Sequence, residues 1–355
     1  HLLYFVPFWP FDHDTFNKLL FVNNNFEFEI RNHHHLRWGS YFIYKISSFF
    51  IDQNFITITI ISFIIFVFSI LIFTYSVHTN LGLFYSIIFV VFCITNKSLN
   101  LEIFSFSVVN QTLLALSILF FYLQRLKISN LSILHAALLG LILFWIYGIK
   151  ETNISFFPLL LFFKIFRKNL LFVLKVVVIS IILYALESIF INYLSLDQNF
   201  IFGRMASLLS GGTEHKDIMA GLTYEGIDTY FEKFFLIFYR WYSARDWDTT
   251  IFYFSFLLSI YFLFNKEDKD IIKNNFSIIN SLLILSFFLF NTFFLISLFP
   301  PILGQPFNTR FLTILLPFSF ISVIILQTLV KSFGDGSLHA ATKQYDSAPS
   351  SFAFF

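Results

Sequence analysis

Long apolar segments recur along almost the whole of this 355-residue chain. An α-helix needs about 20 mostly apolar residues to cross a bilayer, and runs of this kind are rare in soluble domains. Hydrophobic residues make up 57% of the chain and charged residues only 12%, too few to cover a water-soluble surface. The pattern therefore predicts an all-α integral membrane protein. The segments expected to span are 54–77, 81–95, 101–123, 131–148, 153–166, 169–195, 249–264, 277–299 and 310–330.

An apolar stub precedes the first of these segments. Residues 1–9 are too few to cross a bilayer, and we interpret them as the end of a truncated N-terminal helix. With the stub, the count predicts a polytopic helical bundle of about ten transmembrane helices. Because apolar runs leave no room for a second core, residues 1–331 are expected to form one domain. Residues 332–355 are rich in Gly, Ala and Ser, which predicts a disordered tail.

Two longer polar segments, 10–53 and 196–248, interrupt the apolar pattern. Aromatic and aliphatic residues scattered within them predict amphipathic helices on the outer face of the membrane. Short loops rich in Lys and Arg mark the cytoplasmic side. Alternate threading of the spans puts all the basic clusters on one side and both long polar segments on the other. The basic clusters are Arg125 with Lys127, Lys164 with Arg167 and Lys168, Lys266 with Lys269 and Lys273, and Lys331.

Charge, cysteine and histidine usage exclude several other classes of protein. The net charge of +2 and the dispersed Lys and Arg residues argue against a nucleic-acid partner. Cys93 is the only cysteine, so no internal disulfide can form. The consecutive histidines His33, His34 and His35 cannot all face one ion, so no metal site is assigned to them. The N-glycosylation pattern at Asn96 is expected by chance in an Asn-rich chain.

Ionisable residues gather at the expected outer boundary of the membrane. Charge buried in a bilayer is unfavourable unless it is paired or wetted, so these residues predict a shared polar cavity that opens outward. For Glu187, about two turns inside its helix, an interhelical hydrogen-bonded pair is the alternative. The residues expected at this boundary are Asp12, Asp14, Arg37, Glu102, Lys150, Glu151, Glu187 and Arg310.

Asp12-His13-Asp14 follows the stub directly and opens the first polar segment. The order of apolar helix, acidic pair, long outer segment and many spans resembles the GT-C glycosyltransferases. This superfamily includes protein O-mannosyltransferases and the aminoarabinose transferase of lipid A. The resemblance covers most of residues 1–330. Two further stretches look like the family: Leu139-Gly140-Leu141 through Lys150 to Pro158, and Arg310-Phe311-Leu312 through Pro317; Asn110-Gln111 stands where many members have an Asp.

The resemblance implies a glycosyltransferase at the periplasmic face of a bacterial inner membrane. It would move a sugar, with inversion, from a polyprenyl phosphate to a glycan, lipid or protein acceptor. Asp12 or Asp14 would be the general base; the pair departs from the commoner Asp-Glu, which leaves open which one acts. The resemblance implies no certain cofactor beyond the lipid-linked donor substrate, although some members of the superfamily use a divalent metal.

The same resemblance suggests roles for the other boundary residues. A fixed cation would stabilise the leaving phosphate, and the candidates are Arg310, Lys150 and Arg37. Arg310 is preferred because it enters the last span from the outer side, although a snorkelling boundary residue would look the same. The substrate cavity is expected to contain His35, Glu102, Glu151 and Glu187.

Two other functions fit a multispanning chain of this kind. A transporter or flippase of lipid-linked glycans would also need polar residues between helices, with charge near the middle of the bilayer and an internal repeat. An O-antigen polymerase or ligase is the third possibility, but its large outer loop would be expected late in the chain.

Overall fold

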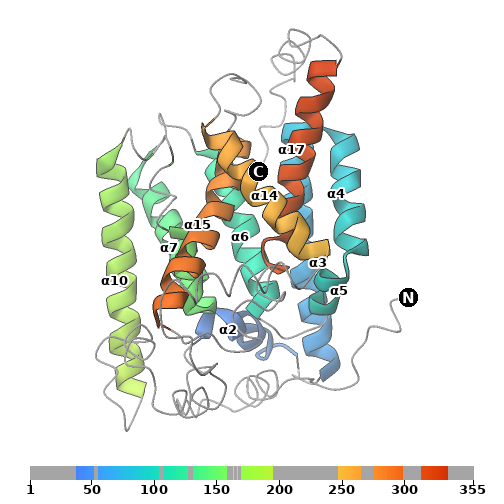
Figure 1. The fold of residues 1–355 in the computed structure, drawn as a ribbon. Coiled ribbons are helices and arrows are strands. Elements are labelled where there is room, and N and C mark those ends of the chain that lie inside the picture. Colours follow the sequence, from blue (N-terminus) through green and yellow to red (C-terminus); the bar gives the residue numbers. More distant parts are fainter. Residues whose placement is uncertain are drawn as a thin grey trace, which may run out of the picture.

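The computed structural model describes residues 37–51, 55–103, 108–126, 131–157, 163, 166, 169–194, 247–264, 275–298 and 313–334. Within these ranges all the regular structure is helical (Figure 1). The elements are α2 Trp38–Ser47, α3 Phe55–Leu81, α4 Leu83–Thr95, α5 Lys97–Ile103, α6 Val108–Arg125, α7 Ile133–Ile149, the 3-10 helix η3 Glu151–Phe156, α10 Leu170–Leu194, α14 Trp247–Phe264, α15 Asn275–Leu298 and α17 Leu316–Gly334.

Three of the described helices are long and apolar enough to cross a membrane. They are α3, α10 and α14, over Ile56–Leu81, Leu170–Ile189 and Trp247–Phe264. The pair α4 and α5 would make a fourth span if it is counted as one, although it bends by 70°. The prediction of an all-helical chain with membrane-spanning helices is confirmed in this form, with three or four candidate spans in the described part of the chain.

Most of the expected segments correspond to one helix each, and three differ. The expected span 101–123 is divided between the end of α5 and α6. The expected span 153–166 begins with the 3-10 helix η3 instead of an α-helix. In the last segment α17 begins at Leu316, with Pro317 in the first turn, where its missing N–H group removes no helical hydrogen bond.

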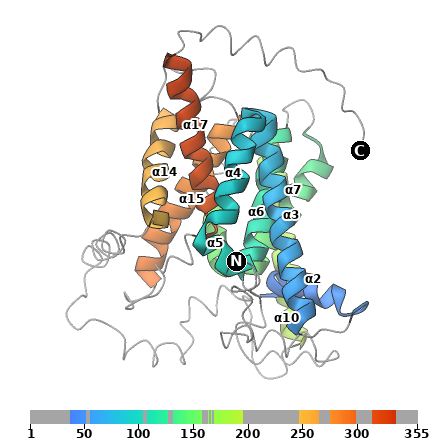
Figure 2. The same cartoon turned by 90° about the vertical axis from the view of Figure 1, so that its right-hand side faces the viewer.

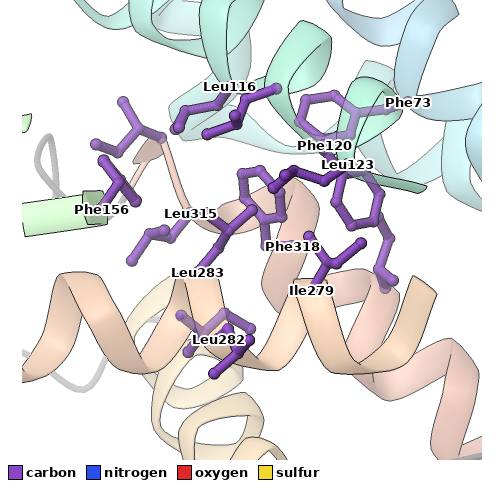
Figure 3. Close-up of a cluster of buried hydrophobic side chains, with 14 of the residues drawn as sticks. Phe73, Leu116, Phe120, Leu123, Phe156, Ile279, Leu282, Leu283, Leu315 and Phe318 are labelled. Carbon is purple, nitrogen blue, oxygen red and sulfur yellow. The ribbon is translucent and has the colours of Figure 1, made fainter. Parts of the chain in front are cut away.

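Two groups of helices share one core. In the first group α3 packs against α4 and α6, and α7 packs against α6 and α10; in the second α14, α15 and α17 pack against one another. Aromatic rings join the groups, because Phe318 of α17 lies 5.0 Å from Phe73 of α3 and 5.5 Å from Phe120 of α6, between ring centroids. Phe120 also lies 5.3 Å from Phe276 of α15. Figure 3 shows three of these rings among the surrounding aliphatic side chains.

Neutral polar side chains line the seam between α14, α15 and α17. Ser255 donates to Ser319 across α14 and α17 at 2.9 Å. Asn280 of α15 donates to the carbonyl of Phe318 at 3.0 Å and to Ser322 at 2.9 Å, both on α17. The four polar side chains and Phe318, which takes part through its backbone carbonyl, are all fully buried. Small polar residues of this kind let membrane helices approach closely and hydrogen-bond across the contact.

The end of the bundle away from α2 carries basic residues expected on the cytoplasmic side. Arg125, at the end of α6, donates to the hydroxyl of Tyr75 at 3.1 Å and lies 5.1 Å from the ring centroid of Phe121. Figures 1 and 2 place the end of α17, which carries Lys331, at the same upper end. The two described positions therefore lie at one end of the bundle, and the side of the membrane that this end faces stays a prediction.

Candidate functional site

Helix α2 lies across the lower end of the bundle, whereas the long helices run toward it (Figures 1 and 2). Side-chain hydrogen bonds join it to three of them. The hydroxyl of Tyr44 lies 2.7 Å from Ser62 of α3 and accepts from Gln111 of α6 at 3.2 Å. The indole of Trp145, on α7, donates to the carbonyl of Gly39 at 3.2 Å. We call the region formed by α2, the first turns of α3 and α6, the end of α7 and η3 the α2 end.

Two glycines bring α2 into backbone contact with α7. A Cβ atom on Gly39 would lie 2.5 Å from the carbonyl carbon of Gly148 and 2.5 Å from the nitrogen of Ile149. A Cβ atom on Gly148 would lie 2.5 Å from the indole ring of Trp38. Both distances are shorter than any ordinary carbon contact, so only glycine fits at either position. The two glycines thus allow α2 to pack directly against the last turn of α7.

Three of the expected site residues meet around this contact. The indole nitrogen of Trp38 donates to a carboxylate oxygen of Glu187, on α10, at 2.8 Å. Arg37 immediately precedes Trp38 as the N-cap residue of α2, and Lys150 follows Ile149 as the C-cap residue of α7. All three ionisable side chains are half-buried. The interhelical hydrogen bond allowed for Glu187 from the sequence is therefore present, and it places an acid beside two basic positions.

Glu102 lies outside the α2 end, on α5, which packs against α6. Its backbone carbonyl accepts from the side chain of Asn110 at 2.5 Å, and Asn110 precedes the Gln111 that bonds Tyr44. The next residue, Thr112, accepts from Asn153 of η3 at 3.1 Å. Asn110 and Gln111 are fully buried, and Glu102 is buried. Where the resemblance would have an Asp, this chain has neutral amides that connect α6 to α5 and to α2.

Burial changes the acidity of two neighbouring residues on α2. It raises the pKa of Tyr44, although the hydrogen bonds with Ser62 and Gln111 act in the opposite direction. The hydroxyl therefore keeps its proton and can donate to Ser62 while it accepts from Gln111. Burial lowers the pKa of Lys45, because desolvation disfavours the ammonium form.

A buried carboxylate on α14 was not among the residues expected from the sequence. Asp248, in the first turn of α14, accepts from Asn96 at 2.6 Å and from the hydroxyl of Ser98. Asn96 stands at the 70° bend between α4 and α5, and its side-chain oxygen accepts from the backbone of Leu99 at 2.9 Å. Asn96 is 8% exposed, so its amide is not open to glycosylation. The position of Asp248 at the start of an apolar helix, where the dipole favours an acid, was the available signal.

The remaining expected residues lie outside the described part of the chain. These are Asp12, Asp14, His35 and Arg310, together with the side chain of Glu151, whose backbone opens η3. Among the described residues, no group of three or more His, Cys, Asp or Glu side chains could hold a metal ion. The structure therefore places Arg37, Lys150 and Glu187 at or next to the contact between α2 and α7, whereas Glu102 lies apart from them on α5.

Comparison of the chain with protein-family models, with curated proteins and with solved structures gave no match.

Proposed function

We propose that the protein is a GT-C type glycosyltransferase, built as a polytopic bundle of about ten transmembrane helices with amphipathic helices on the outer face. In this proposal the α2 end faces the periplasm of a bacterial inner membrane. The observation that supports it most is the gathering of Arg37, Lys150 and Glu187 at one end of an otherwise apolar bundle. Charged groups within membrane-spanning helices are rare and often mark a substrate path, and Glu187 lies within the candidate span of α10. Arg37 also lies on the segment that begins with Asp12 and Asp14.

The proposed reaction transfers a sugar from a polyprenyl phosphate in one displacement. The acceptor hydroxyl attacks the anomeric carbon while Asp12 or Asp14 takes its proton. The bond between the anomeric carbon and the phosphate oxygen breaks, and its electron pair leaves with the phosphate. Arg310, Lys150 and Arg37 stabilise the added negative charge in a poorly hydrated site. Because phosphate leaves readily, no strong general acid is needed, in contrast to glycosidases.

The test is sugar transfer from a panel of radiolabelled polyprenyl-phosphate sugars by the protein in nanodiscs. Wild type is compared with Asp12→Asn and Asp14→Asn. We expect one variant to lose turnover by at least about 100-fold, the contribution of a positioned base, and to keep donor binding. Undiminished transfer in both variants would reject these acids as the base. The absence of transfer by wild type from every donor in the panel would reject the enzyme itself.

A transporter of lipid-linked glycans is the second candidate. The observation that favours it is the 70° break between α4 and α5 with the buried carboxylate of Asp248 beside it. Discontinuous helices with polar groups at the break form the substrate and ion sites of many transporters. Vesicles loaded with a fluorescent lipid-linked glycan separate the two functions. Movement of the intact lipid across the bilayer without bond cleavage would favour the transporter.

A further inference from the structure

Four large apolar side chains at the C-terminal end of α2 and in the turn that follows it are exposed. Exposed fractions are 53% for Ile46, 62% for Phe49, 82% for Phe50 and 55% for Ile51. The N-terminal end of the same helix is buried against α7 through Gly39 and Trp38. We call Ile46, Phe49, Phe50 and Ile51 the α2 patch. A cluster of exposed large apolar side chains marks a contact with lipid or with another protein.

The α2 patch lies close to the exposed apolar face of α3. Ile51 and Phe55 are four residues apart, so their Cα atoms are separated by at most about 15 Å. Ile56 and Ile60, in the first turns of α3, are 68% and 52% exposed, and that face continues down the helix with Phe63, Phe68 and Leu71. Because α3 is apolar enough to span a membrane, its exposed face is the surface expected to meet lipid. The α2 patch extends this surface at the end of the span.

The depth of α2 agrees with the edge of the hydrocarbon. The first ionisable side chain near the far end of α3 is the exposed His78. The hydrocarbon core is about 30 Å thick, or about 20 helical residues, which brings its other edge to about residue 58. Ser62, whose hydroxyl hydrogen-bonds Tyr44 of α2, lies one helical turn inside that edge, toward the middle of the bilayer. Helix α2 therefore crosses α3 within several ångströms of the boundary, where amphipathic helices bind.

We propose that the α2 patch is a membrane-insertion site, which enters the boundary between headgroups and acyl chains and holds α2 across the end of the bundle. The N-terminal end of α2 is fixed to protein and its C-terminal end to lipid. Arg37 and the carboxylate bonded to Trp38 are then held at the depth of lipid headgroups. This proposal needs a membrane but does not depend on glycosyl transfer.

The single cysteine of the chain makes a depth measurement simple. Cys93 is buried, and Cys93→Ala gives a background without thiols. A spin label is placed at Phe50→Cys in nanodiscs, and its collision rates with molecular oxygen and with a water-soluble nickel chelate are measured. Phe68→Cys, on the exposed face of α3, is the deep control. Lys331→Cys, an exposed cation in the last turn of α17, is the aqueous control.

We expect the label at residue 50 to collide with nickel several-fold less often than the label at residue 331. Its ratio of oxygen to nickel collisions should fall between the two controls. A nickel rate equal to that at residue 331 would overturn the proposal, because the patch would face water. Protection from both reagents would also overturn it, since a second copy of the chain or another segment would then cover the patch.

A second variant tests whether insertion holds the helix. Phe50→Ser changes a side chain that packs on little of the protein, so the fold is expected to remain intact. In nanodiscs the backbone amides of α2 should exchange with deuterium several-fold faster than in wild type. Phe68→Ser, which loses lipid contact on α3, should leave the exchange of α2 unchanged. Equal exchange of α2 in wild type and Phe50→Ser would contradict an anchoring role.

Discussion

The α2 end and the seam between α14, α15 and α17 both bury polar side chains, but they use them differently. In the seam, neutral Ser and Asn side chains connect helices that run alongside one another. At the α2 end, glycines bring two backbones into contact across crossing elements, and ionisable residues surround the contact. The seam can be explained by helix packing alone. The α2 end holds charge at a membrane boundary, which packing does not require, and this difference makes it the candidate site.

The glycine contact at the α2 end should show the largest single effect. In Gly39→Ala the new methyl group would meet the backbone of Gly148 and Ile149, which cannot move without displacing the end of α7. We expect a loss of about 3 kcal/mol in the free energy of unfolding, at the upper end for overpacking. Denaturant unfolding in detergent measures it, with deuterium exchange of α2 as a local probe.

Gly140→Ala is the matched control for that substitution. Its new Cβ atom would lie 2.9 Å from the Cγ2 atom of Ile179, a side-chain atom on α10 that can yield more easily than backbone. The loss in the free energy of unfolding should therefore be smaller than for Gly39→Ala. The deuterium exchange of α2 should not change. Equal losses of unfolding free energy in both variants, with unchanged deuterium exchange in α2, would contradict this prediction. The contact at Gly39 would then be no tighter than ordinary helix packing.

The next effect concerns the buried carboxylate at the bend between α4 and α5. Asp248→Leu keeps the branched shape of the side chain but leaves the buried amide of Asn96 without its acceptor. We expect the free energy of unfolding to fall by about 2 kcal/mol, a value within the range for hydrogen bonds to charged groups. Asp248→Asn keeps one acceptor oxygen and should lose less. If the leucine variant is as stable as wild type, this carboxylate does not hold the bend, and its use as a substrate or ion site becomes the better explanation.

The sequence predicted the elements that depend on apolar length and missed those that depend on contacts between distant segments. The runs at 54–77 and 169–195 become α3 and α10 because a long apolar run in lipid has to satisfy its backbone groups as a helix. The break between α5 and α6 lies inside one apolar run. It coincides with Asn110, which bonds the end of α5 from within α6. Apolar counting does not register such a partner.

The same reasoning applies to the candidate site. Arg37, Lys150 and Glu187 were expected at one boundary because each lies near the end of an apolar run. Their meeting depends on two glycines and one indole, whose roles no pattern within a single segment reveals. Asp248 was missed because it lies at the edge of a polar segment, where an acid is unremarkable. Its partners, Asn96 and Ser98, are about 150 positions earlier in the chain.

A smaller effect is expected in the seam. Asn280→Leu removes the hydrogen bonds to the carbonyl of Phe318 and to Ser322 and keeps the branched shape of the side chain. Hydrogen bonds between membrane helices contribute about 0.6 kcal/mol on average, so the two together should contribute about 1 kcal/mol. Unfolding in detergent of Asn280→Leu, Ser322→Ala and the double variant gives the coupling between the two side chains. A loss of unfolding free energy as large as that of Gly39→Ala would show that the seam tolerates substitution no better than the α2 end.

The smallest expected effect comes from Lys45 and bears on the environment of α2. Burial lowers the pKa of this residue in the folded protein, so between that pKa and the ordinary value of about 10.4 the unfolded chain binds more protons. Stability should therefore rise slightly with pH just below 10.4, and Lys45→Met should remove this rise. The measurement is unfolding in detergent between pH 8 and pH 11, the interval that brackets this titration. A pH dependence of opposite sign would mean that a charge partner, and not desolvation, dominates around Lys45, and α2 would then lie in a more polar environment than the seam.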